Sequence, residues 1–86
     1  MHFIYVLHSQ VSSFQYIGMT ADLQDRLRQH NHGKVRSTKS FRPFRIVYTE
    51  SFDTLLEARI REVYLKTAAG RRFIAKVLTV GGSPPA

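Results

Sequence analysis

The sequence predicts a small α/β (α+β) domain in which a three-stranded antiparallel sheet is flanked by about three helices. Two short β-branched and aromatic runs lie near the N-terminus, a third alternating run lies in mid-chain, and helical apolar spacing with capping residues fills much of the rest. No linker-like stretch divides the 86 residues, so one core must serve the chain. Cysteine is absent, so packing must hold that core together.

The first two strands are expected to form a hairpin. His2–His8 is apolar on both alternating faces, as in a central strand, and Phe14–Met19 is the next apolar run. The stretch Ser9–Ser13 between them suits an antiparallel connection. Because alternate residues of a strand share a face, this pairing points Tyr5 and Tyr16 the same way.

A first helix is expected from about Ala21 to Asn31. Thr20 can cap it, two aspartates in its early turns favour the helix dipole, and a glycine past its end favours termination. Leu23 and Leu27 form its apolar stripe. The next segment, Gly33–Phe44, is rich in Lys, Arg and Ser and is predicted to be a loop.

The third strand is expected at Arg45–Phe52, where apolar and polar residues alternate. A second helix should follow at once, because Thr54 and Glu57 have the spacing of a capping box. The apolar stripe of this helix is predicted to be Leu56, Ile60 and Val63, and Gly70 is predicted to end it.

A last helix is predicted from Gly70 to Leu78, packed through its apolar side chains. The Gly- and Pro-rich residues 79–86 are predicted to be a disordered tail, so the folded domain is expected at 1–78. The N-terminus lacks the charged and apolar regions of a signal peptide, which favours a cytoplasmic protein without a membrane partner.

The charge of the chain points to a polyanionic partner. Lys and Arg outnumber Asp and Glu by 13 to 6, for a formal charge of +7. No acid interrupts the stretch from Arg26 to Arg45, and phosphate contact is favoured there over simple solvation. The residues expected to contact nucleic acid are Lys34, Arg36, Lys39, Arg42, Arg45 and Lys66.

The order of several motifs resembles the GIY-YIG nuclease family. Phe3-Ile4-Tyr5 is followed after ten residues by Tyr16-Ile17-Gly18, then by an arginine on the next helix and a glutamate on a later one. The likeness extends from about Phe3 to Leu78 and is strongest to small stand-alone members. The chain is also similar to the catalytic domains of excision-repair nucleases and of homing endonucleases.

This resemblance implies a catalytic role for five residues. By position, Tyr5 and Tyr16 would line the site, and Arg26 would contact the scissile phosphate. His30 would assist nearby, and Glu62 would bind one divalent ion, Mg²⁺ or Mn²⁺. The residue types suit these roles. Cations or a metal can favour a tyrosine phenolate, an arginine fork matches phosphate oxygens, and Mg²⁺ commonly uses only one or two protein carboxylates.

Ordinary structural roles compete with each assignment. The tyrosines could simply pack against a helix, Arg26 could pair with Asp22, and His30 could pack the end of its helix. A surface ion pair with Lys66 or Arg59 is the strongest rival explanation for Glu62. A zinc site around the two neighbouring histidines is rejected, because no further ligand completes it.

The chain departs from the family pattern at two places. Phe3 replaces the first glycine, and Gly70–Ile74 lacks an asparagine that larger relatives often carry after the glutamate helix. The resulting hypothesis is a divalent-metal-dependent endonuclease acting on nucleic acid, with DNA the expected substrate. The alternative is a non-catalytic nucleic-acid-binding module on the same scaffold. Substrate choice would come from the basic loop, a homodimer or a helper protein.

Overall fold

The computed structural model describes residues 1–81 and contains one antiparallel sheet. Its strands are β1 (His2–Ser9), β2 (Gln15–Thr20) and β3 (Phe44–Phe52), in the order β2-β1-β3. β1 is central because it is apolar on both faces, and its residues from Ile4 to Leu7 are buried. The predicted three-stranded sheet is confirmed, with strand limits shifted by one residue.

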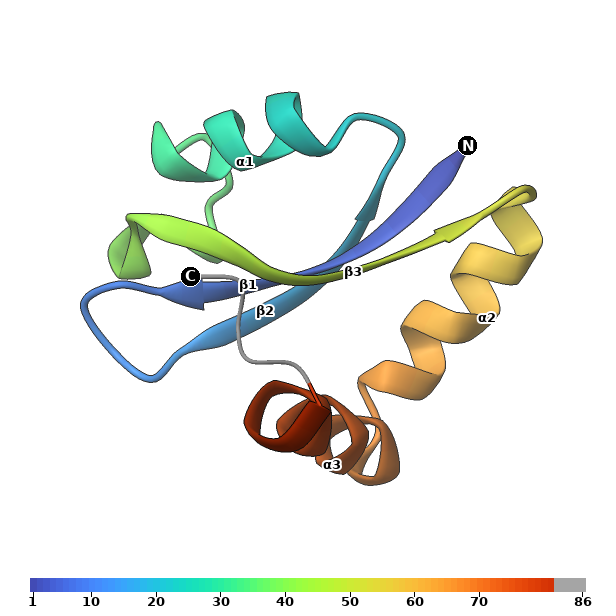
Figure 1. The fold of residues 1–86 in the computed structure, drawn as a ribbon. Helices are drawn as coiled ribbons and strands as arrows, with labels where there is room; N and C mark the ends of the chain where they lie inside the picture. Colours follow the sequence, from blue (N-terminus) through green and yellow to red (C-terminus); the bar gives the residue numbers. More distant parts are fainter. Residues whose placement is uncertain (82–86) are drawn as a thin grey trace.

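The sheet is the middle layer of the molecule. Figure 1 shows α1 (Leu23–Asn31) on one face of the sheet and α2 (Leu55–Leu65) and α3 (Ala68–Lys76) on the other. Two short helical turns, η1 (Lys39–Phe41) and η2 (Val77–Gly81), complete the described part. No helix among the described residues is long and apolar enough to cross a bilayer.

Side-chain alternation along the strands produces a separate core on each face. The α1 side is built around Tyr5, Leu7 and Phe44. The opposite side contains Ile4, Val6, Ile17, Val47, Ala58, Leu65 and Ile74.

The start of α1 differs from the prediction. Asp22, not Thr20, caps the helix, because the Asp22 carboxylate accepts from the backbone N–H of Asp25 at 3.0 Å. Thr20 instead bonds to the backbone of Asp22. Gly33 follows the helix with a φ of 75°, the left-handed conformation that favours glycine at this position.

The predicted apolar stripe of α2 is wrong. Leu56, Ile60 and Val63 are 69%, 61% and 61% exposed, whereas Ala58 and Leu65 are buried. The face of α2 that points toward the sheet consists of positions 58, 61, 62 and 65. It therefore carries Arg61 and Glu62 between two apolar residues. Arg61 is held there by Glu50 on β3, at 2.8 Å.

The helical region after Thr54 is divided earlier than predicted. α2 keeps its predicted capping box but ends at Leu65, not at Gly70. The Thr67 hydroxyl accepts from the N–H of Gly70 and so caps α3. A Cβ at Gly70 would collide with the backbone at Tyr64 and Leu65, so glycine permits this close approach of the two helices.

The predicted tail overlaps the last described helical turn. Residues 79–81 belong to η2, and residues 82–86 of the predicted tail lie outside the described residues.

Candidate active site

The two motif tyrosines lie side by side on the α1 face of the sheet, as predicted. In the hairpin Tyr5 pairs with Gly18 and Leu7 pairs with Tyr16. The rings of Tyr5 and Tyr16 are 6.2 Å apart between centroids. A Cβ on Gly18 would overlap the hydroxyl end of the Tyr5 ring, so the glycine leaves the space into which that phenol extends.

The Tyr5 hydroxyl forms hydrogen bonds with two side chains of α1. Arg26 Nε donates to Tyr5 Oη at 3.3 Å, and His30 Nε2 lies 3.0 Å from the same oxygen. Arg26 and His30 are four residues apart and therefore neighbours on one side of the helix. The helix thus brings a permanent cation and an imidazole to the same phenol.

Burial keeps this phenol and imidazole neutral. Burial raises the pKa of Tyr5 because it disfavours the phenolate, and the hydrogen bond from Arg26 opposes this effect only in part. Burial also lowers the pKa of His30 to about 4, with a contribution from the charge of Arg26. At neutral pH the site holds a protonated tyrosine beside an uncharged histidine.

His30 has a second partner that sequence analysis missed. Its Nδ1 lies 2.8 Å from Oγ1 of Thr38, and that hydroxyl is 3.3 Å from the carbonyl oxygen of Val35. Both His30 and Thr38 are fully buried. In the sequence Thr38 resembles any loop residue, because a single threonine among Lys, Arg and Ser carries no signal of a buried contact.

Arg26 is positioned by its own helix. Its Nη1 donates to Oε1 of Gln29 at 2.7 Å, and Gln29 in turn donates to Asp25. No Arg26–Asp22 ion pair, the rival explanation, is found among the described residues. Arg26 thus donates to Tyr5 and Gln29, and, after Tyr5, Tyr16 also contributes to the raised pKa of the Arg26 guanidinium.

Glu62 lies on α2, on the other face of the sheet from α1, and among the described residues no hydrogen bond or ion pair joins it to Tyr5, Tyr16, Arg26 or His30. Burial is the main cause of the raised pKa of Tyr5, and the charge of Glu62 adds to it. The Glu62 side chain is 17% exposed, and Lys66 Nζ approaches its Oε2 at 3.3 Å. The described residues show no Glu62–Arg59 ion pair. The rival ion pair with Lys66 therefore exists, and the charge of Glu62 is the smallest of the causes that act on the pKa of Tyr5.

Glu62 supplies a single carboxylate, so it would fit a hard cation only if oxygen atoms of the substrate completed the set of ligands. Within residues 1–81 no three His, Cys, Asp or Glu side chains gather as a metal site. Mg²⁺ commonly takes one or two protein carboxylates and fills its octahedron with water and phosphate oxygens. A single carboxylate such as that of Glu62 is compatible with this pattern only together with substrate phosphate oxygens.

A cavity of about 260 Å³ borders the site at the edge of the sheet. Tyr16 lines it on one side, and Lys66 and Arg71 from the α2–α3 junction line it on the other. The cavity therefore joins a candidate catalytic tyrosine to two cations.

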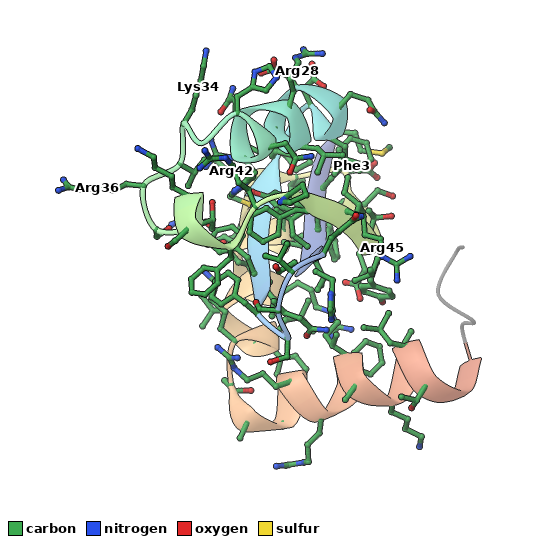
Figure 2. The ribbon with its side chains drawn as sticks, turned by 90° about the vertical axis from the view of Figure 1, so that its left-hand side faces the viewer. Phe3, Arg28, Lys34, Arg36, Arg42 and Arg45 are labelled. Atoms are coloured by element: carbon green, nitrogen blue, oxygen red, sulfur yellow. The ribbon has the colours of Figure 1, made fainter. Side chains whose placement is uncertain are left out.

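The predicted nucleic-acid-binding residues do not form one cluster. Figure 2 shows Lys34 and Arg36 projecting from the loop after α1, with Arg42 nearer to the helix. Arg42 Nη1 donates to the carbonyl of Lys39 at 2.8 Å. Arg45 lies away from this loop and lines a hollow with Val47 on the α3 side of the sheet.

Known proteins match this chain in both sequence and fold. The model of the GIY-YIG catalytic domain family matches residues 1–73. The UPF0213 protein YazA of Bacillus subtilis is 42% identical over 66 residues, which cover 76% of this chain and 66% of that protein. A UPF0213 protein of Staphylococcus saprophyticus is 40% identical over 67 residues, or 77% of this chain and 80% of the relative.

A solved structure supports the same relationship. The NMR structure of the UPF0213 protein BH0048 from Bacillus halodurans has a TM-score of 0.56 and 32% sequence identity, covering 94% of this chain and 86% of that one. The chain spans slightly less than two thirds of the Bacillus subtilis relative it matches. The family match covers the paired tyrosines, Arg26 and Glu62 together, and the chain belongs to the GIY-YIG catalytic domain family.

Proposed function

We propose that residues 1–78 form a divalent-metal-dependent endonuclease that hydrolyses phosphodiester bonds of nucleic acid, with DNA the expected substrate. The observation that carries the proposal is the Tyr5 hydroxyl, which forms hydrogen bonds with both Arg26 Nε and His30 Nε2. Family membership supports a nuclease class, and the bonded tyrosine supports a specific proton-transfer route within it.

Tyr5 is the proposed general base. As a water molecule attacks the phosphorus, its proton passes to Tyr5 Oη while the Tyr5 proton passes to His30 Nε2. This relay suits two neutral groups, because it does not require a free phenolate with a raised pKa to accumulate. Tyr16, on the neighbouring strand, would lie next to the reacting water and contact the phosphate.

Arg26 is the proposed phosphate ligand. Its Nε holds Tyr5, and its remaining guanidinium donors would stabilise the charge that develops on the phosphoryl oxygens. The hydrogen bond from Nη1 to Gln29 keeps the guanidinium in place before substrate arrives. The side chain therefore loses little conformational entropy when substrate binds.

Glu62 would hold a Mg²⁺ or Mn²⁺ ion, and such an ion, when bound, supplies Lewis acid stabilisation of the phosphate and leaving oxygen. Lys66, which now contacts Oε2 of Glu62, would have to release that oxygen if both carboxylate oxygens were to serve as ligands. The freed Lys66 and its neighbour Arg71 would then face the substrate across the cavity beside Tyr16. Exposed Lys34, Arg36 and Lys39 would hold the nucleic acid backbone through phosphate contacts.

The test is cleavage of defined substrates by the purified protein. Single-stranded, duplex and branched DNA and RNA are incubated with Mg²⁺ or Mn²⁺, with and without a chelator. The Glu62→Gln variant should cut none of them, whereas Glu57→Gln, on the exposed face of the same helix, should cut as the wild type does. Absence of metal-dependent cutting from every substrate, or full activity of Glu62→Gln, refutes the proposal.

A non-catalytic binding module is the second candidate. The Glu62–Lys66 ion pair favours it, because it occupies the only carboxylate proposed for the metal. In that case binding should be salt-dependent without any cutting. Substitution of Lys34 or Arg36 should then weaken binding more than Glu62→Gln does.

A further inference from the structure

We infer that Thr38 is a positioning residue that fixes the proton of His30 on Nδ1, so that His30 Nε2 stays free to accept the proton of Tyr5. This inference rests on the proposed function, because it gives the general base its acceptor. The observation is an unbroken series of hydrogen bonds that runs from the half-buried Arg26 through the buried Tyr5, His30 and Thr38 to the half-buried Val35.

The donors and acceptors in this series determine its direction. Arg26 Nε can only donate, so Tyr5 Oη accepts from it, and the hydroxyl hydrogen of Tyr5 remains available to His30 Nε2. At the other end the carbonyl of Val35 can only accept, so the hydroxyl of Thr38 donates to it. Thr38 Oγ1 is then an acceptor toward His30, whose Nδ1 must carry the hydrogen.

The opposite tautomer leaves this network incomplete. With the hydrogen on Nε2, the Tyr5 oxygen would face two donors, Arg26 and His30, and its own hydroxyl would have no acceptor in the series. No buried side-chain nitrogen or oxygen of the described residues lacks a partner. The Nδ1–H tautomer is the arrangement that uses every donor, and a neutral His30 permits it.

The basic loop holds Thr38 in place. The N–H of Thr38 donates to the carbonyl of Val35, and the carbonyl of Thr38 accepts from Phe41 across the turn η1. The Ser9 hydroxyl ties the carbonyl of Phe41 to the end of β1 at 2.6 Å. The segment that presents Lys34, Arg36 and Lys39 to solvent thus also orients the proton acceptor of the site.

The first test is the tautomer itself, which needs no enzymatic activity. Long-range ¹H–¹⁵N spectra at pH 7 distinguish a protonated from an unprotonated ring nitrogen, and the His30 signals are assigned by their loss in His30→Gln. The wild type and Thr38→Ser should show Nδ1–H. In Thr38→Val, which keeps the shape of threonine but lacks its oxygen, the Nδ1 hydrogen loses its acceptor, so the share of His30 with its hydrogen on Nε2 should rise. An Nε2–H tautomer in the wild type, or an unchanged tautomer in Thr38→Val, overturns the inference.

The second test is cleavage kinetics. Thr38→Val should lower kcat by roughly 10²-fold, the range expected for loss of a correctly oriented base, with KM within about twofold of the wild type. Thr38→Ser should restore most of kcat, and Ser37→Ala is the matched loop control. An equal loss in the Ser and Val variants contradicts the inference.

The two tests separate this inference from the proposed function. A protein that shows the expected tautomers but cuts no substrate contradicts the nuclease proposal and supports the assignment of Thr38. A protein that cuts with His30 protonated on Nε2 contradicts the assignment alone. If Thr38→Val does not fold, the wild-type spectrum and the Thr38→Ser variant still decide the tautomer.

Discussion

The two halves of the candidate site differ in how completely the protein itself builds them. The half on β1 and α1 is closed, because Tyr5 and His30 are buried and the side-chain oxygen of Tyr5 and both ring nitrogens of His30 have hydrogen-bond partners. The half on α2 is open, because within residues 1–81 the partner of Glu62 is a partly exposed lysine. We infer that the protein prepares the proton-transfer groups in advance and leaves the cation side for substrate to complete.

The largest expected effect comes from removing the hydroxyl of the closed half. Tyr5→Phe keeps the ring but eliminates the atom that bridges Arg26 and His30, so cleavage should fall by about 10² to 10⁴-fold. DNA affinity should stay within about twofold, as measured by fluorescence anisotropy. Tyr64→Phe, an exposed tyrosine on α2, is the control. Cleavage within tenfold of the wild type would show that the closed half is structural only.

The second prediction concerns the stability of that half as a function of pH. The pKa of His30 is lowered to about 4 in the folded protein, from an ordinary value of 6.5. The unfolded chain therefore binds more protons between these values. Stability that is fully present above pH 6.5 should be lost as the pH falls toward 4, by up to about 3 kcal/mol.

Urea unfolding of the wild type at pH 7 and pH 4.5 measures this loss. The His30→Gln variant should lose much less stability over the same interval, because glutamine at position 30 does not titrate. His32→Gln, at an exposed position of the same segment, should behave as the wild type does. An identical pH dependence in all three proteins would contradict the burial of a neutral His30.

The sequence was sufficient to predict the closed half because local patterns determine it. Strand alternation placed Tyr5 and Tyr16 on one face, and spacing along one helix placed Arg26 beside His30. Thr38 was not predictable in this way. It lies eight residues after His30, and only the irregular path of the loop brings the two together.

The open half exposed the limits of hydrophobic periodicity. Hydrophobic periodicity compares the faces of a helix by hydrophobicity alone. The spacing of Leu56, Ile60 and Val63 therefore predicted that the outer face of α2 would be buried. The inner face instead carries Arg61, which pairs with Glu50, and Glu62, which pairs with Lys66. A functional helix can therefore turn its charged side toward the sheet, and its sequence periodicity then points the wrong way.

A third and smaller effect should follow from filling the space beside Tyr5. Gly18→Ala places a methyl group against the hydroxyl end of that ring, and overpacking of this kind costs about 1 to 3 kcal/mol. Thermal unfolding should show the loss of stability, and cleavage should fall because Tyr5 must move from Arg26 and His30. The exposed Gln15→Ala on the same strand is the control. Wild-type stability and activity would mean that this half is not closely packed.

The smallest expected effect lies in the open half, at Lys66. Its ion pair with Glu62 spans 3.3 Å and is partly exposed, so it contributes about 0.2 to 1 kcal/mol. If Glu62 must exchange this lysine for a metal ion, Lys66→Met should lower the Mn²⁺ concentration for half-maximal cleavage by up to roughly fivefold. Lys76→Met, on the exposed side of α3, should leave it unchanged. A higher Mn²⁺ requirement in Lys66→Met would instead show that the lysine holds Glu62 in its working position, and the open half would then be as prearranged as the closed one.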